Sequence, residues 1–137
     1  MLQYPSTAAQ GDAMNALSAT AAQGREDRAA IVTVLRILDE FRSLRPDLPI
    51  SRAYTLLCVA LEEGRPVNEY AKDQEVPKTT MTRHLLDLGD QTRRREPGMG
   101  LLIQRMSPLD RRIHETFLTP SGRALVHRVL RIFKQGK

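Results

Sequence analysis

The chain has 137 residues, 41% of them hydrophobic, so it is long enough for one compact domain and too short for two typical ones. Its single cysteine, Cys58, excludes an intrachain disulfide and a finger-type zinc site, and its three histidines have no metal-ligand spacing. No apolar run approaches the length of a membrane span, and the N-terminus has no targeting signal. We therefore expect a cytoplasmic protein with no metal, no cofactor and no membrane partner.

The net charge of +5 is unevenly distributed along the chain. Residues 1–77 contain 8 basic and 11 acidic residues, whereas residues 78–137 contain 13 basic and 5 acidic residues. This asymmetry favours a polyanionic partner for the second part of the chain. It does not distinguish DNA from RNA or from an acidic protein surface. The alternative is a basic face that is merely solvated and binds no polyanion.

The N-terminal part of the chain changes character near residue 25. Residues 1–24 are rich in Ala, Ser, Thr, Gln and Gly, which predicts a disordered arm. From Arg25 to Leu44 apolar residues recur with the helical period and cover more than one face of the predicted helix. A helix this broadly apolar needs two neighbours, and residues 25–49 comprise this helix and its exit. The stripe consists of Ile31, Val34, Leu35, Leu38 and Phe41.

Three further helices are predicted before residue 90. The first spans about Arg52 to Glu63, with Ser51 as its cap and an apolar stripe that contains Tyr54, Leu57, Cys58 and Leu61. A brief helix from Asn68 to Gln74 follows. After a tight connection, Pro77 begins a helix over Lys78 to Leu88, and Gly89 terminates it. Two short helices across a short turn are typical of a helix-turn-helix motif.

A hairpin and a final helix complete the pattern. Asp90 to Gly100 is expected to be a loop, and the runs Leu101–Met106 and Ile113–Leu118 form the strands of a two-stranded wing. Thr119 caps a last helix with Pro120 at its first position. This C-terminal helix occupies residues 120–137. Its apolar stripe is Leu125, Val129, Ile132 and Phe133.

The helix over Lys78 to Leu88 has one core-facing side, formed by Met81, Leu85 and Leu88. The remaining positions carry short hydroxyl groups and long cations, which suit base edges and phosphates. Arg83 is placed to read guanine bidentately, and threonine methyl groups suit thymine. An ordinary solvated helix face is the competing interpretation. The candidate DNA-binding residues here are Lys78, Thr79, Thr80, Thr82, Arg83 and His84.

Five arginines outside this helix are also candidates for DNA contact. Arg111 and Arg112 lie at the wing tip, where a guanidinium group can follow phosphates or enter a narrow minor groove. Asp110 is expected to shape the hairpin or to pair with an arginine. Arg93, Arg94 and Arg95 suit phosphate contacts, although a solvated arginine-rich loop is an equally ordinary interpretation.

Three motifs together resemble the MarR family of winged-helix transcriptional regulators. They are Thr79 to Arg83 in the predicted recognition helix, Asp110 to Arg112 at the wing, and Leu118 to Gly122 at the start of the last helix. The resemblance covers roughly Ile50 to Leu125. It implies a symmetric dimer built from the first and last helices, so that residues 25–49 and 120–137 would be dimerisation segments and their apolar stripes the interface. It also implies two recognition helices in successive major grooves of a palindromic site. The chain differs from the family pattern in its Asp90–Gly100 insertion and in having room for only one helix after the wing.

The sequence therefore predicts a mainly α (α+β) winged helix-turn-helix domain over residues 25–137, with a DNA-binding lobe at 50–119. The predicted function is a dimeric, sequence-specific regulator of transcription, most simply a repressor. The alternatives are a DNA-binding accessory protein of replication, partition or recombination, and a winged helix used for protein contact. No motif of phosphate binding or nucleophilic catalysis is present, so an enzyme is not expected. A small-molecule effector is possible but nothing in the sequence indicates one.

Overall fold

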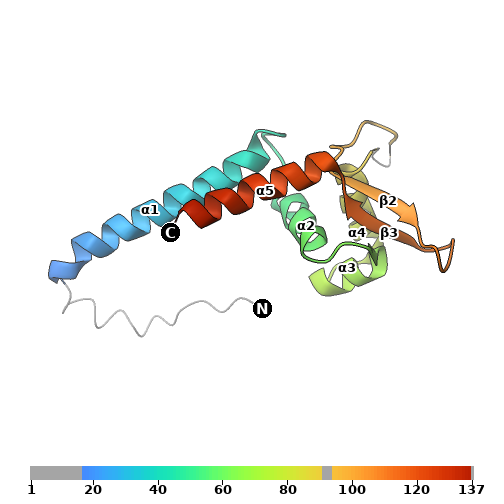
Figure 1. Ribbon diagram of the computed structural model, residues 1–137, viewed down its shortest axis with the longest axis horizontal. Helices are drawn as coiled ribbons and strands as arrows, with labels where there is room; N and C mark the ends of the chain where they lie inside the picture. The colour runs from blue at the N-terminus through green and yellow to red at the C-terminus, as the bar shows by residue number, and fades with distance from the viewer. Residues whose placement is uncertain (1–16, 91–93, 137) are drawn as a thin grey trace.

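The computed structural model describes residues 17–90 and 94–136, with side chains described from residue 20 onward. It is a mainly α winged helix-turn-helix fold, as predicted. Two long helices lie side by side at one end, and the shorter helices and a small sheet form a lobe at the other end (Figure 1). The elements are α1 (Leu17–Arg42), α2 (Ile50–Leu61), β1 (Arg65–Pro66), α3 (Val67–Gln74), α4 (Lys78–Leu88), β2 (Leu102–Met106), β3 (His114–Leu118) and α5 (Pro120–Gln135).

The predicted wing is confirmed, and it belongs to a three-stranded antiparallel sheet with the order β1-β3-β2. Strands β2 and β3 pair from Leu102 opposite Leu118 to Met106 opposite His114. The third strand, β1, is only Arg65–Pro66 and pairs with the start of β3. No strand was predicted there, because two residues with a proline show no strand periodicity.

The core lies between α2, α4, the sheet and the first half of α5. Met81, Leu85 and Leu88 are buried, which confirms the predicted inner side of α4. They meet Leu56 and Val59 of α2 in a single cluster. Burial of these large side chains supplies the main stabilisation of the lobe and fixes the orientation of α4.

The first helix begins at Leu17, earlier than the predicted start at Arg25. Residues 17–24 are therefore helical and not part of a disordered arm, since their alanines and glutamine favour a helix. Residues 1–16 of the predicted arm lie outside the described residues. Every described side chain from Thr20 to Val32 is exposed, because α5 reaches only the second half of α1. A Cβ atom built on Gly136 would lie 2.6 Å from Oγ1 of Thr33, which marks where α5 ends along α1.

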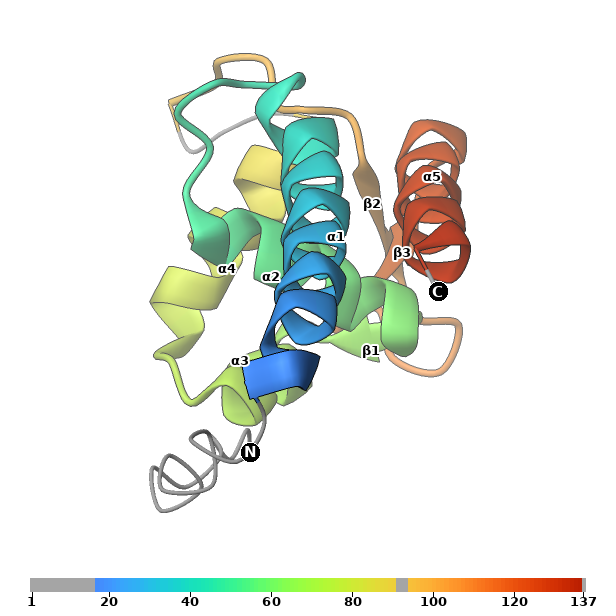
Figure 2. The same ribbon diagram turned by 90° about the vertical axis from the view of Figure 1, so that its left-hand side faces the viewer.

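The predicted dimer stripes divide into two groups. Phe41, Leu125, Val129 and Ile132 are buried within the chain itself, so their prediction as interface residues is wrong. Phe41, Leu125 and Val129 belong to the core cluster of the chain. Helices α1 and α5 are antiparallel and run side by side in both views (Figures 1 and 2). The other predicted residues remain exposed apolar side chains. These are Ile31, Val34, Leu35, Leu38 and Phe133.

Helix α2 is apolar on two sides. Leu56 and Val59 face the core, whereas Tyr54, Leu57 and Leu61 of the predicted stripe are exposed. Periodicity identified a real stripe but not the side that the chain buries. The helix also begins one residue before the predicted cap, and its N-cap residue, Pro49, makes no side-chain cap hydrogen bond.

Candidate nucleic-acid interface

Helix α4 is held as the second helix of the helix-turn-helix, with bounds that match those predicted. Glu75 ends α3 in the left-handed region at φ 55°, and Pro77 directs the chain into Lys78. On the outer side, Lys78, Thr79 and Arg83 are exposed. The inner side packs in the core, so the helix presents a polar face on a fixed frame.

Two other predicted contact residues of α4, Thr80 and Thr82, are half-buried. The hydroxyl of Thr82 donates to the carbonyl oxygen of Lys78 at 2.9 Å, one helical turn earlier. This bond leaves its methyl group and its oxygen lone pairs for other contacts. Thr79 and Arg83 are thus the most accessible neighbours of Lys78 on this face.

His84 was predicted to face DNA, and this prediction is wrong. The residue is only 7% exposed, and its Nδ1 atom lies 3.2 Å from Oγ1 of Thr55. Thr55 in turn donates to Oε1 of Gln74 at 3.1 Å. Since the threonine proton points to Gln74, Nδ1 of a neutral His84 carries the proton that it donates to Thr55. His84 therefore joins α4 to α2 and α3.

The surroundings of His84 favour its neutral form. Burial lowers its pKa, and the nearby positive charge of Arg52 lowers it further. Arg52 itself forms an ion pair with Asp87, with its Nε and Nη2 atoms 2.8 and 2.6 Å from Oδ2. This pair connects the start of α2 to the end of α4. Both polar contacts fix the rotation of α4 about its axis, because each involves a residue on its inner or lateral side.

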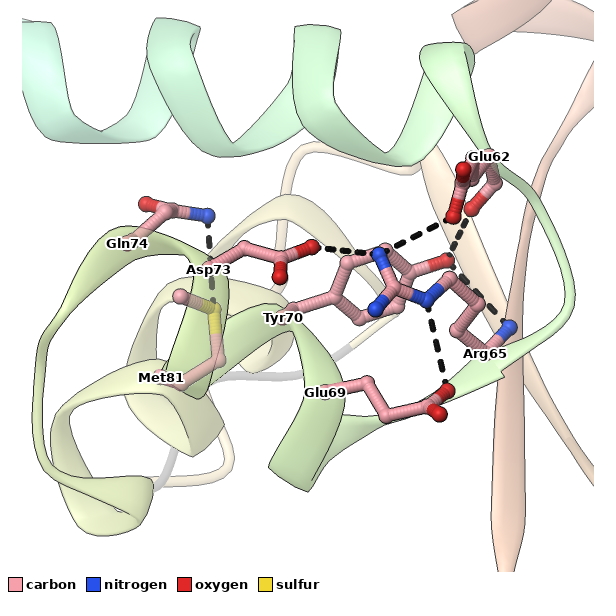
Figure 3. Close-up of polar contacts among 7 residues, drawn as sticks. All are labelled: Glu62, Arg65, Glu69, Tyr70, Asp73, Gln74 and Met81. Carbon is pink, nitrogen blue, oxygen red and sulfur yellow. Dashed lines mark hydrogen bonds and ion pairs between the residues drawn. The ribbon is translucent and has the colours of Figure 1, made fainter. Parts of the chain in front are cut away.

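A second cluster fixes α3 and the sheet, and Figure 3 shows it around Arg65. The Arg65 guanidinium forms ion pairs with Asp73, Glu69 and Glu62, of which those to Glu69 and Glu62 are 3.3 and 3.1 Å long. These hydrogen bonds, above all the one to Asp73, raise its pKa above the ordinary value. The Arg65 side chain also lies over the ring of Tyr70, whose hydroxyl donates to the Glu62 carbonyl oxygen at 2.6 Å. The charge of Arg65 is therefore balanced by carboxylates of its own chain.

The wing tip is closed by a set of local hydrogen bonds. The carboxylate of Asp110 accepts from the backbone N–H and the guanidinium of Arg112, at 3.0 and 3.2 Å. These bonds lower the pKa of Asp110. The prediction that Asp110 shapes the hairpin and pairs with an arginine is confirmed. Arg111 is exposed and makes no ion pair with any residue in the described ranges.

Helix α4 and the wing face each other across a cleft of about 240 Å³. Lys78 and Thr82 line it from the helix, and Arg112 lines it from the wing. Gln104 and His114 form part of the wall between them, and Asn68 contributes from the start of α3. Three of the predicted contact residues, Lys78, Thr82 and Arg112, thus lie around one cleft.

The insertion after α4 is tied to the end of that helix. Gly98 and Gly100 donate backbone hydrogen bonds to the carbonyl oxygens of Asp90 and Gly89, at 2.8 and 2.9 Å. A Cβ atom on Gly98 would lie 2.1 Å from the Gly89 carbonyl oxygen, so this approach requires glycine. The loop therefore projects from the C-terminal end of α4. Arg94 and Arg95 are exposed on it, and Arg93 lies outside the described residues.

Within the described residues, no group of three or more His, Cys, Asp and Glu side chains is placed to hold a metal ion. Across the same ranges, none of the helices has both the length and the apolar character needed to cross a membrane.

No protein-family model matches the sequence, and no curated protein matches it. Solved structures do match the fold. A MarR-like transcriptional regulator from Thermotoga maritima is 24% identical, with a TM-score of 0.58, over 80% of this chain and 73% of that one. The S. aureus MepR–DNA complex is 19% identical, with a TM-score of 0.55, over 85% of this chain and 82% of that one. The repressor CouR, bound to a 23-mer DNA duplex, is 23% identical, with a TM-score of 0.53, over 89% and 75%. The chain thus has the winged helix-turn-helix fold of MarR-type transcriptional regulators.

Proposed function

We propose that this chain is a MarR-type transcriptional regulator that binds double-stranded DNA in a sequence-specific manner. The observation that carries the proposal is that Lys78 of α4 and Arg112 of the wing line one cleft, and that the same two elements carry the further exposed cations Arg83 and Arg111. Lys78, Arg83 and Arg111 have no ion pair among the described residues, whereas Arg52 and Arg65 are paired with carboxylates. Two proteins with the same fold, MepR and CouR, have been solved with DNA.

The two elements have different roles in this proposal. Helix α4 enters the major groove, where Arg83 donates to guanine and Thr79 contacts a neighbouring base or phosphate. The wing lies on the flanking backbone, where Arg111 and Arg112 contact phosphates or the edge of the minor groove. The buried contacts of His84 and Asp87 hold α4 at a fixed rotation, which base reading requires.

The regulator acts as a homodimer in this proposal. Ile31, Leu35 and Leu38 form an exposed apolar stripe on α1 at helical spacing, and Phe133 of α5 is exposed as well. A stripe of this kind in a single chain is typical of a surface that a second copy covers. Leu35→Glu should therefore shift the protein toward monomer in sedimentation velocity, while the exposed charge exchange Arg36→Glu on the same helix should not.

A twofold dimer places two α4 helices on half-sites that are about 34 to 36 Å apart, one turn of the double helix. Occupying such a palindrome within a promoter excludes polymerase, which is the simplest mode of repression.

The test is selection of preferred duplexes from a random pool by the full chain, followed by titration of selected and scrambled duplexes across a salt series. We expect a palindromic consensus and a salt-sensitive non-specific mode on scrambled DNA. Arg83→Ala should lose affinity for the selected duplex more than for the scrambled one, by about 1 to 3 kcal/mol. Equal losses on both duplexes would contradict base reading by Arg83. Absence of any binding to duplex at low salt would favour a protein-contact role, and bound sites at an origin would favour an accessory role in replication.

A further inference from the structure

The wing tip ends in apolar side chains that the fold does not use. Leu109, at the outermost turn, is 96% exposed, and Met106 and Ile113 beside the tip are also exposed. Single exposed apolar residues are common, but here three lie within eight residues of one hairpin. Leu109 stands two residues before Arg111, on the wing that carries proposed DNA contacts, so its almost complete exposure needs an explanation of its own.

The loop that carries Leu109 is preformed. The backbone N–H of Ser107 donates to the Ile113 carbonyl oxygen at 2.8 Å, and that of Ile113 donates to the Asp110 carbonyl oxygen at 3.0 Å. The N–H of Leu109 donates to Oγ of Ser107 at 3.2 Å, and Ser107 itself is buried. With the Asp110–Arg112 contacts, these bonds hold the turn in one shape. Presenting Leu109 therefore costs little ordering entropy when a partner binds.

Charge complementarity selects the partner. Arg111 and Arg112 follow Leu109 in the same turn, and Arg112 lines the cleft that leads to α4. Arg112 pairs with Asp110 but stays exposed, and Arg111 is exposed as well, so the turn combines an exposed apolar side chain with two exposed guanidinium groups. This combination matches the DNA minor groove, which has phosphates along its edges and the apolar faces of sugars and bases inside. An acidic protein surface offers the charge but not a narrow slot beside the site that α4 occupies.

We propose that Leu109 is a minor-groove wedge. In this inference, which rests on the proposed function, α4 occupies the major groove and the wing tip enters the adjacent minor groove. Leu109 presses against a base step while Arg111 and Arg112 hold the phosphates on its two sides. Apolar wedges of this type partly unstack a step and bend the duplex, and they favour flexible pyrimidine–purine steps over stiff A-tracts. Leu109 thus adds specificity at a position where no base-edge hydrogen bond is made.

The test compares Leu109→Ala with the full-length wild type on two versions of the selected duplex. One version carries a TA step under the wing and the other carries an A-tract there. Duplex bending is measured from energy transfer between dyes at the two ends, and affinity is measured across a salt series. The matched control is Leu61→Ala, which truncates a leucine that is 84% exposed on α2.

We expect Leu109→Ala to reduce the bend and to lose about tenfold in affinity on the TA duplex, with a smaller loss on the A-tract duplex. Its salt dependence should match that of the wild type, because no cation is removed. Leu61→Ala should behave as the wild type on both duplexes.

Three outcomes would overturn the proposal. If Leu109→Ala binds and bends both duplexes as the wild type does, the wedge is refuted while the proposed DNA-binding function stands. If Leu109→Ala loses the same affinity on both duplexes, and this loss changes with salt concentration, the wing tip contacts only phosphates. If the wild type binds no duplex, both proposals fall, and the apolar tip becomes a candidate surface for a protein partner. Unchanged circular dichroism and thermal unfolding of Leu109→Ala exclude a folding defect in each case.

Discussion

Replacing Arg111 by Ala should change how DNA affinity depends on salt, and the expected size of the change follows from the structure. Arg111 is exposed at the wing tip and forms no ion pair within the described part of the chain. Its removal therefore breaks no contact that stabilises the fold. In the proposed dimer the substitution removes two cations from the proposed DNA-binding surface. Each phosphate contact contributes about 0.9 to the slope of log affinity against log salt.

The slope should consequently become less negative by about 1.8. Over a fourfold rise in salt, from about 50 to about 200 mM, this change corresponds to roughly a twelvefold difference. The loss of affinity caused by Arg111→Ala should thus be about twelve times larger at the lower salt concentration than at the higher one. Fluorescence anisotropy of a labelled duplex, titrated at several salt concentrations with scrambled DNA as well as the selected site, measures this slope directly.

Arg25→Ala is the matched control, because it removes the same charge from an exposed position on α1 outside the DNA-binding lobe. Its slope should equal that of the wild type. Equal slopes for Arg111→Ala and Arg25→Ala would mean that the affinity reflects net charge and not a phosphate contact at the wing. That result would refute the placement of the wing on the DNA backbone.

Three further predictions concern the frame that holds the site. Gly122→Ala should lower the free energy of unfolding by about 1 to 3 kcal/mol, because the new Cβ would lie 2.1 Å from the Leu101 carbonyl oxygen. Gly24→Ala is the matched control: a Cβ there meets nothing within 4 Å, so it should stabilise α1 by about 0.5 to 1 kcal/mol. Urea unfolding measures both. Folding lowers the pKa of His84, so the unfolded chain binds the proton first as the pH falls. The free energy of unfolding should therefore decrease below about pH 6.5. This decrease should be smaller in His84→Gln, which has no imidazole to protonate. Leu85→Ala, at a buried position, should cost about 2 to 5 kcal/mol in the same unfolding assay.

Local signals in the sequence account for the parts of the fold that were predicted well. Helix α4 begins and ends where Pro77 and Gly89 place it. The last helix begins at Thr119, whose side chain accepts a hydrogen bond from the N–H of Gly122 at 3.1 Å, with Pro120 at the next position. Each of these signals acts within a few residues, so a single sequence contains all the information that it needs.

The errors arose where the outcome depends on a distant segment. His84 is polar and lies near the edge of the apolar side of α4, so its fate depends on whether another helix offers a hydrogen-bond partner. Thr55 of α2 does so, and no periodicity in α4 could have indicated it. Likewise, the stripe on α5 was identified correctly as apolar, but Leu125 and Val129 are buried in the core of their own chain.

The distribution of ion pairs gives a physical reason to separate the frame from the working surface. Arg65 is surrounded by three carboxylates, and Arg123 is held by Glu63 at 3.0 Å, so both charges stabilise contacts between elements. Lys78 and Arg83 have no such partner among the described residues, although their mutual repulsion with the wing arginines opposes folding slightly. A fold gains nothing from leaving these charges unpaired on one side. A polyanion that binds across α4 and the wing removes that repulsion and releases its own counterions. Unpaired cations that do not help folding therefore favour the proposed binding of DNA.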